Sequence, residues 1–236
     1  MIKLVLQPTT NHLSEIKKWL KKEWDETKQG FYCNWNIIDE SFDKGNLNVI
    51  TQNDNAIGFV VFRIYDLTAV LDIAEIKPTH RKNGLARKMI AETLEFLKLK
   101  GVLAIELFCS PKDSEPFWKK MGFKDFPILP REFRINLYKT LIETLPNSDK
   151  EKTSYEIRLW DCEPYQAHNR KAKWTWDLSF VSGENLLTKP IIFPVAQDWQ
   201  IELLNNNKVI ISDKVKYCGL DDGNYGTFLI IRDIST

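Results

Sequence analysis

Residues 73–100 read IAEIKPTHRKNGLARKMIAETLEFLKLK, and this stretch decides the fold. Just before and within its start, residues 70–76 alternate between two sets of side chains with the period of a β-strand. From residue 86 to residue 97, apolar side chains recur at helical spacing and form one stripe, which predicts a helix over residues 86–100. Between them lies the basic run Arg81-Lys82-Asn83-Gly84-Leu85-Ala86. The stretch therefore predicts a strand, a glycine-containing turn and a helix.

The turn has the properties of an anion-binding site. The first N–H groups of a helix have no partner within the helix, and the helix dipole is positive at that end. Gly84 permits unusual dihedral angles and a close approach of a ligand to the backbone. Arg81, Lys82 and Arg87 add positive charge around the same point. The run matches neither the P-loop nor the dinucleotide fingerprint, and we interpret it as a pyrophosphate site.

The order strand, R-x-x-G-x-A, helix resembles the acetyl-CoA signature of the GCN5-related N-acetyltransferases, the GNAT superfamily. Pro78 and the downstream segment FWKKMGF (117–123) agree with this resemblance, which covers residues 1 to about 145. It implies a GNAT fold of the α/β (α+β) class, with a mixed, mostly antiparallel sheet flanked by helices. It also implies acetyl-CoA (coenzyme A) as the cosubstrate and a primary amine as the acceptor.

The resemblance assigns roles to particular positions. The strand residue at Ile76 is expected to pair with the pantetheine arm, and its N–H can polarise the thioester carbonyl. The residues expected to contact coenzyme A are Ile76, Lys77, Arg81, Lys82, Asn83, Gly84, Leu85, Ala86, Arg87 and Ser114.

Family members often carry the general base earlier on the same strand. Regular alternation puts Val70, Asp72, Ala74 and Ile76 on one face, so Asp72 is the first candidate for the base. It is also consistent with a polar residue that merely lines a wet groove. Glu75 points the other way and becomes the candidate if the strand contains a β-bulge.

The sequence departs from the family pattern where a tyrosine often protonates the leaving thiolate. Trp118 occupies that place, and an indole is not a useful acid. Water or another group, such as Tyr138, would have to serve instead. Cys109 lies near the expected acetyl position, where a small buried thiol is a simpler interpretation than an acyl-enzyme nucleophile.

Composition limits the classes of protein that fit. The chain has 236 residues, a hydrophobic fraction of 43% and a formal net charge of +1, so no bulk attraction to nucleic acid or membranes is expected. The four cysteines and three histidines show no metal-ligand spacing, and we expect no metal site. The N-terminus does not resemble a signal peptide and no apolar run has membrane-spanning length. We therefore expect reduced thiols and a cytoplasmic location.

The rest of the chain changes character. Residues 146–154 are rich in proline, serine and charge, and we interpret them as a linker between a transferase domain (1–145) and an accessory domain (155–236). The accessory domain shows short strand patterns separated by Asn, Gly and Asp turns, which predicts an all-β sandwich or barrel. Its segment 169–176 mixes basic and aromatic residues and would suit a solvated loop better than an RNA-stacking surface.

Two functional hypotheses follow from the sequence. The first is an acetyl-CoA-dependent N-acetyltransferase whose acceptor is a small molecule or a protein amino group; an aminoacyl-tRNA acceptor gains little support from the low net charge. The second is a non-catalytic acyl-CoA-binding sensor with a C-terminal binding module, which the presence of Trp118 favours.

Overall fold

The computed structural model describes residues 1–127, 135–148, 154–223 and 226–234. The chain divides into two units. One comprises Met1–Lys124 and Ile135–Leu141, and the other comprises Asp125–Arg134 and Ile142–Thr236. Within the described part of the chain, no helix combines the length and apolarity needed to cross a bilayer.

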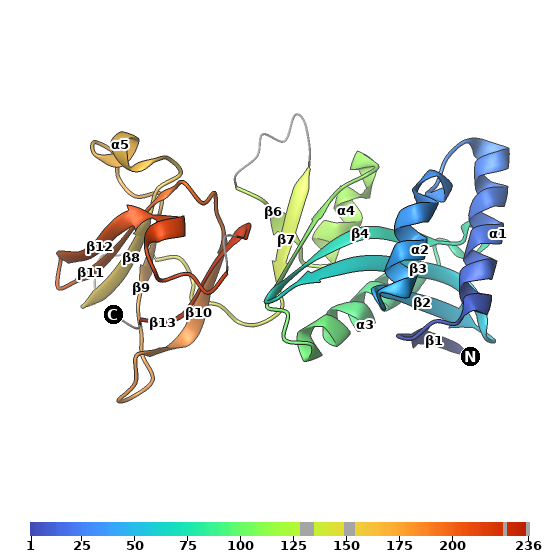
Figure 1. The fold of residues 1–236 in the computed structure, drawn as a ribbon, viewed down its shortest axis with the longest axis horizontal. Helices are drawn as coiled ribbons and strands as arrows, with labels where there is room; N and C mark the ends of the chain where they lie inside the picture. Colours follow the sequence, from blue (N-terminus) through green and yellow to red (C-terminus); the bar gives the residue numbers. More distant parts are fainter. Residues whose placement is uncertain (128–134, 149–153, 224–225, 235–236) are drawn as a thin grey trace. The chain divides into compact units, whose positions relative to one another are not determined.

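A single sheet organises the first unit. Its strands are β1 (Ile2–Val5), β2 (Leu47–Gln52), β3 (Asn55–Tyr65), β4 (Thr68–Ile76), β5 (Ala104–Phe108), β6 (Lys124–Asp125) and β7 (Asn136–Thr140). Among the described residues the strand order is β1-β2-β3-β4-β5-β7-β6 (Figure 1). β4 and β5 pair in parallel, whereas β1–β2, β2–β3, β3–β4 and β5–β7 are antiparallel. The predicted mixed, mostly antiparallel sheet is confirmed.

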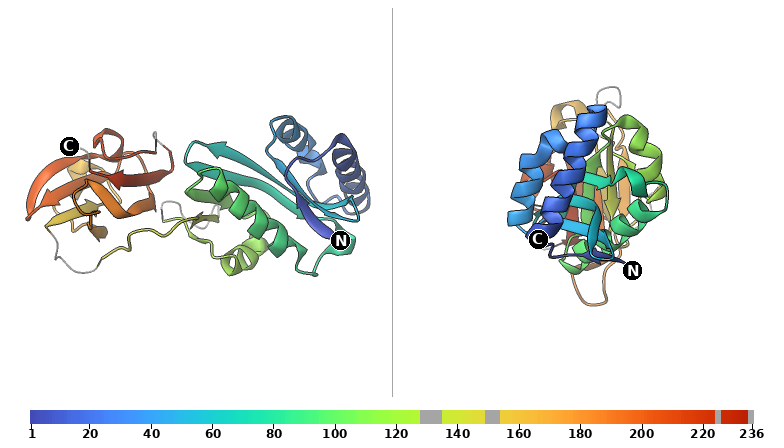
Figure 2. Two further views of the ribbon diagram at one scale, coloured as in Figure 1. Left: turned by 90° about the horizontal axis from the view of Figure 1, so that it is seen from below. Right: turned by 90° about the vertical axis from the view of Figure 1, so that its right-hand side faces the viewer.

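Helices cover both faces of this sheet (Figure 2). The helices are α1 (Thr10–Thr27) and α2 (Trp35–Asp43) on one face, and α3 (Leu85–Leu99) and α4 (Glu115–Lys120) on the other. Ile16 of α1 packs with Phe59 in the core on the first face, and Met89 of α3 packs with Phe62 in the core on the second. Apolar side chains at helical spacing thus bury one stripe of α3, as the sequence predicts, and one stripe of α1.

Thr9 caps the start of α1. It precedes the first helical residue, and its backbone N–H donates to Nδ1 of His12 at 3.1 Å. A histidine at the third helical position thus satisfies the backbone donor that a glutamate usually satisfies.

A β-bulge interrupts β4. In the pairing with β3, Phe62 lies opposite Leu71 and Val61 lies opposite Ile73, so the register passes over Asp72. An extra residue in one strand reverses the alternation of side chains beyond it.

The bulge corrects one expectation from the sequence. Ile76 packs in the core beneath α3, as does Leu71, whereas Ile73 packs in the core beneath α1. Asp72 follows Leu71 directly, so it points away from the face that Leu71 shares with Ile76. The prediction that Asp72 shares the face of Ile76 is therefore wrong. Glu75 follows Ile73 by two residues, so it lies on the α1 face of the strand.

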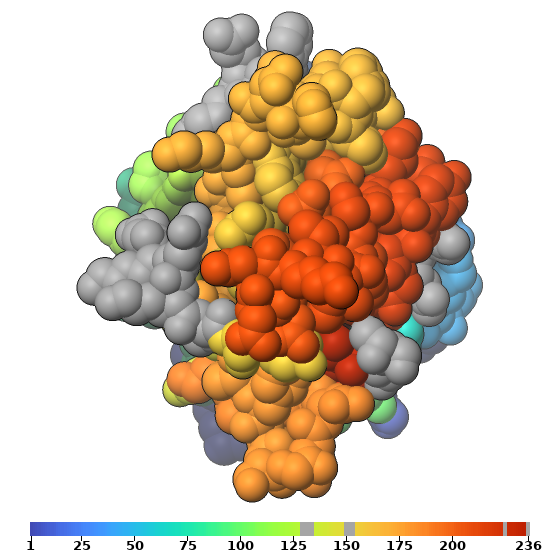
Figure 3. Space-filling model, turned by 90° about the vertical axis from the view of Figure 1, so that its left-hand side faces the viewer, coloured from blue at the N-terminus to red at the C-terminus, as the bar shows by residue number. Residues whose placement is uncertain are grey.

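Apart from the short helix α5 (Pro164–Ala167) and a 3₁₀ turn at Val215–Tyr217, the regular elements among the described residues of the second unit are strands. Its strands are β8 (Tyr155–Leu159), β9 (Trp174–Asp177), β10 (Leu186–Pro194), β11 (Gln200–Asn205), β12 (Lys208–Lys214) and β13 (Phe228–Asp233). Within the described residues, β12-β11-β8-β9 form one antiparallel sheet and β10-β13 another. Side chains of both sheets share one core. Figure 3 shows one face of this unit, coloured yellow to red.

Within the 169–176 segment, residues 169–171 and Lys173 are exposed and lead into β9, whose tryptophans belong to this core. Trp176 is buried, and the ring of Trp174 stacks on Trp199 with centroids 5.3 Å apart. Lys173 is paired with Asp161. The aromatic rings are thus used for packing within the unit.

The expected linker overlaps the second unit. The N–H of Leu145 donates to the carbonyl oxygen of Pro190 at 2.8 Å, and the N–H of Ser148 donates to that of Thr175 at 2.7 Å. Residues 149–153 of the predicted linker lie outside the described residues. The domain limits 1–145 and 155–236 therefore stay a prediction.

Candidate active site

The edge of β4 opens in the middle of the sheet. Thr68–Val70 pairs with Ala104–Glu106 of β5, and within the described residues the pairing ends there. The remainder of β4 continues beside β3 alone, with Gly58 opposite Ile76. On the side of β4 that faces β5, the backbone N–H and C=O groups beyond Val70 have no strand partner among the described residues. They can bind an extended ligand. The parallel strands β4 and β5 therefore pair over three residues only, as far as the described residues show.

The turn that follows β4 has two left-handed residues. Lys82 has φ of 66° and Gly84 has φ of 74°, and α3 begins directly after Gly84. Such a turn directs successive N–H groups toward one point. A Cβ added to Gly84 would meet nothing within 4 Å, so the space in front of the turn is open. Lys82, Asn83 and Arg87 are exposed around it.

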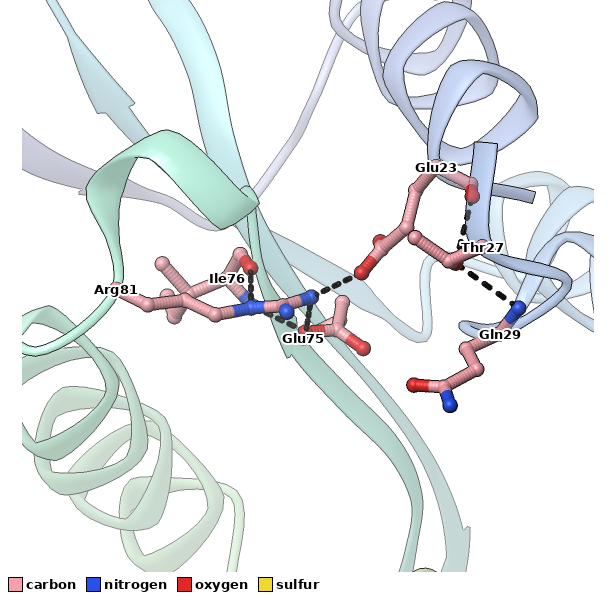
Figure 4. Close-up of polar contacts among 6 residues, drawn as sticks. All are labelled: Glu23, Thr27, Gln29, Glu75, Ile76 and Arg81. Carbon is pink, nitrogen blue, oxygen red and sulfur yellow. Dashed lines mark hydrogen bonds and ion pairs between the residues drawn. The ribbon is translucent and has the colours of Figure 1, made fainter. Parts of the chain in front are cut away.

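Arg81 turns its charge toward the sheet. Its Nε donates to the carbonyl oxygen of Ile76 at 2.9 Å, and its Nη2 lies 2.9 Å from Oε1 of Glu75. The same Nη2 lies 2.6 Å from Oε1 of Glu23 on α1. Figure 4 shows the guanidinium between the two carboxylates. The positive charge of Arg81, which the sequence assigned to the phosphate site, is thus paired with the carboxylates of Glu23 and Glu75.

Glu75 is held in a way that suits a proton acceptor. Oε1 accepts hydrogen bonds from Arg81 and from the backbone N–H of Ile76, the latter at 3.1 Å, and its side chain is 14% exposed. Burial raises the pKa of this carboxyl; the charge of Arg81 opposes the rise and the charge of Glu23 adds to it. A carboxylate with a raised pKa accepts a proton more readily.

Comparison with known proteins agrees with this geometry. Residues 10–123 match the model of the acetyltransferase (GNAT) family. This region belongs to the GNAT family. No curated protein sequence is significantly similar to the chain.

Solved structures of acetyltransferases are similar to part of the chain. A GNAT-family protein from Desulfovibrio desulfuricans is 14% identical, with a TM-score of 0.51 over 60% of this chain and 100% of that chain. PaiA N-acetyltransferase from Thermoplasma acidophilum, solved in complex with coenzyme A, is 17% identical, with a TM-score of 0.47 over 59% of this chain and 99% of that chain. At such identity the first of these matches shows the GNAT fold alone.

Asp72, the first candidate base in this GNAT domain, has another partner. Its two carboxylate oxygens accept from Nε and Nη2 of Arg63, each at 2.7 Å. A bidentate pair of this kind occupies the carboxylate. The structure thus removes the geometric reason for preferring Asp72 to Glu75.

The region of the missing GNAT tyrosine is a packed core. Trp118 is buried and makes edge-to-face contacts with Phe117 and Phe123, at centroid distances of 5.0 and 5.4 Å. Burial raises the pKa of Tyr138 on β7, which keeps its phenol protonated at neutral pH. Cys109 is buried in the same apolar core, in agreement with a packing role.

One polar group near α4 lacks a protein partner. Ser114 precedes α4, and its Oγ is buried without a hydrogen-bond partner among the described residues. A buried hydroxyl without a partner is costly unless another molecule supplies one. This observation supports the expectation that Ser114 contacts a ligand.

Glu23 is a site residue that was not predicted from the sequence. Its side chain is 8% exposed, and it lies on the buried stripe of α1 together with Ile16, Trp19 and Leu20. A charged residue on an apolar stripe is the signal that would have found it, because an unpaired charge is expensive to bury.

Proposed function

We propose that this protein is an acetyl-CoA-dependent N-acetyltransferase that acts on a primary amine by direct attack on the thioester. The observation that carries the proposal is the arrangement at the end of β4. There an open strand edge leads into a left-handed glycine turn at a helix N-terminus, and a buried carboxylate with a raised pKa lies beside it. The cytoplasmic location expected from the sequence stays a prediction.

The residues of the turn fit coenzyme A. The open space in front of Gly84 leaves room for phosphates, and the first N–H groups of α3 at Leu85, Ala86 and Arg87 would donate to them. Exposed Lys82 would add charge. Ile76 and Lys77 at the strand end and Ser114 before α4 would hold the arm. Arg81 would act through the carboxylates it binds.

Acetyl-CoA supplies an activated acetyl group as a thioester. The amine nitrogen forms a bond to the carbonyl carbon, the carbon–sulfur bond breaks, and coenzyme A leaves as the thiol. An amine arrives as an ammonium ion at neutral pH, so the protein must first remove a proton. Glu75 is the residue placed to do so: Oε1 is fixed by two donors, and no donor among the described residues reaches Oε2.

The N–H of Ile76 has two possible uses. In the structure it donates to Glu75, which fixes the base. While that bond persists, this N–H is not available to polarise a thioester carbonyl. The proposal therefore assigns Ile76 first to orientation of Glu75 and to pairing with the arm of coenzyme A.

Cofactor binding is tested by Gly84→Glu. A carboxylate in the open space before the turn should abolish acetyl-CoA binding, measured by isothermal titration calorimetry, because it places like charge against the phosphates. Gly101→Glu is the matched control: Gly101 follows the other end of α3, also has positive φ (87°), and its added Cβ also meets open space. The control should bind acetyl-CoA normally. Equal affinities in both folded variants would contradict the assignment of the turn.

A non-catalytic acyl-CoA sensor is the second candidate. The buried Trp118 favours it, because an indole packed in the core offers no acid for the leaving thiolate. Release of free thiol from acetyl-CoA, measured with a panel of small amines and amine-bearing proteins, separates the two functions. Binding without release in the presence of every acceptor would favour the sensor.

A further inference from the structure

Glu23 brings a second carboxylate to the candidate base from a distant part of the sequence. It projects from α1 toward β4, where Nη2 of Arg81 lies 2.6 Å from its Oε1 and 2.9 Å from Oε1 of Glu75 (Figure 4). One guanidinium nitrogen thus serves two carboxylates. With both ionised, the three side chains carry a net charge of −1.

The position of Glu23 is fixed by its own helix and loop. Thr27 Oγ1 donates to the carbonyl oxygen of Glu23 at 2.7 Å, and Gln29 N–H donates to that hydroxyl at 3.1 Å. The chain then passes close over the carboxylate at Gly30, which has φ of 88°, and a Cβ at Gly30 would lie 3.1 Å from Glu23 Oε2. The end of α1 is therefore shaped around this side chain.

Because Glu23 is buried, its negative charge acts strongly on neighbouring groups. Glu23 is 8% exposed, and its Oε2 is buried without a hydrogen-bond partner among the described residues. A buried carboxylate needs a partner of opposite charge, and among the described residues Arg81 is the one that pairs with Oε1. Screening by water is weak in such a site, so the charge of Glu23 acts on Glu75 through Arg81 and directly.

We propose that Glu23 is a positioning residue for Glu75: it draws Arg81 into a shared ion pair, so that Arg81 orients the base without fully neutralising it. The proposal rests on the assignment of Glu75 as the base. The groups that face Glu75 are Glu23 from α1, Arg81 from the turn and the N–H of Ile76 from its own strand. Asp72 on the same strand is occupied by Arg63.

The direction of the effect follows from the charges. In Glu23→Gln, Arg81 faces Glu75 alone and the neighbouring negative charge is gone. Both changes favour the ionised form of Glu75, so its pKa falls. The acid limb of the kcat–pH profile should move to lower pH by about one unit, the size expected when a close charge is removed. The plateau rate should fall several-fold because a weaker base takes the proton less readily.

Glu26→Gln is the matched control. Glu26 lies on the same helix one turn away, is exposed, and pairs only loosely with Lys22 at 3.8 Å. This variant should leave the profile unchanged. If Glu23→Gln does not fold, Glu23→Asp keeps the charge but withdraws it by one methylene, and a smaller shift in the same direction is expected. An acid limb that stays in place in either folded Glu23 variant would overturn the proposal.

A second readout does not depend on turnover. The titration of the Glu75 carboxyl can be followed by NMR in protein labelled with ¹³C at glutamate side chains, with Glu75→Gln identifying the signal. Its midpoint should fall in Glu23→Gln and stay in Glu26→Gln. An unchanged midpoint overturns the proposal whether or not the protein is active. A lowered midpoint in a protein that acetylates no amine supports the coupling and refutes only the proposed function.

Discussion

Glu75 is fixed through one carboxylate oxygen, which leaves the other for a proton. Glu75→Gln keeps the shape and removes the basicity, so kcat should fall roughly 10²–10⁴-fold, the usual contribution of a general base. In the wild type, kcat should rise with pH through the pKa of Glu75, which burial places above the ordinary value for a glutamate. Protonation below that pKa removes the acceptor, so the activity is lost on the acid side.

Asp72→Asn provides the comparison for this prediction. It removes a bidentate partner of Arg63 but leaves the groups around Glu75 in place. The acid limb should therefore persist in Asp72→Asn and disappear in Glu75→Gln, with acetyl-CoA affinity little changed in both. The opposite pattern would restore Asp72 as the base.

Individual residues show where the sequence sufficed. Gly84 and the residues around it were predicted from a local pattern, since a left-handed turn before a helix depends on neighbours in the chain. Glu75 could be offered only as an alternative, because its face depends on the register against β3. Glu23 lies 52 residues before Glu75, and its role depends on how α1 packs on the sheet. Contacts between residues so far apart cannot be predicted from a local sequence pattern. The only indication in the sequence is a charged residue on the apolar stripe of a helix.

The β3–β4 pair fixes the geometry of the site at a glycine. A Cβ at Gly58 would lie 2.4 Å from Ile76 Cδ1 and 2.8 Å from the carbonyl oxygen of Glu75. Gly58→Ala should therefore separate the strands and destabilise the fold by about 1–3 kcal/mol, as overpacking usually does. Because the displaced backbone carries the base, kcat should fall as well. Denaturant unfolding and steady-state rates measure the two effects.

Gly45→Ala separates crowding from backbone conformation. Gly45 lies two residues after the end of α2 and has φ of 69°. A Cβ there would meet open space. The substitution should cost stability of about 1 kcal/mol, through the left-handed backbone alone. Its kcat should be normal. If Gly58→Ala also left kcat normal, the spacing of β3 and β4 would not control the base.

The strand and the helix around the turn lie close to where sequence periodicity placed them. β4 (Thr68–Ile76) contains the predicted residues 70–76, α3 (Leu85–Leu99) lies one residue from the predicted 86–100, and the all-β character of the second unit follows from its short strand patterns. The bulge at Asp72 is the main exception. An extra residue in one strand is defined by what lies opposite it, so an alternating sequence such as that of residues 70–76 does not reveal it.

The two units are linked by more than one passage of the chain. The segment that begins at Asp125 belongs to the second unit, and the chain returns to the first unit for β7 before leaving it again at Ile142. Phe126 accordingly packs edge-to-face on Phe228, with ring centroids 5.7 Å apart, and both side chains are buried. A cut within the predicted linker would leave Phe126 and Phe228 on different fragments.

Cleavage at a specific protease site inserted after Lys150 should therefore yield two fragments that co-elute in gel filtration. Truncation of a buried phenylalanine typically costs about 3–5 kcal/mol, so Phe126→Ala should weaken this association strongly. Tyr165→Ala is the control, since Tyr165 is an aromatic residue of the second unit that is 74% exposed. The cleaved control should remain associated. Fragments that separate without any substitution, each folded by circular dichroism, would show that residues 146–154 are a simple linker. In that case the segment from Asp125 would contribute little to the stability of the second unit.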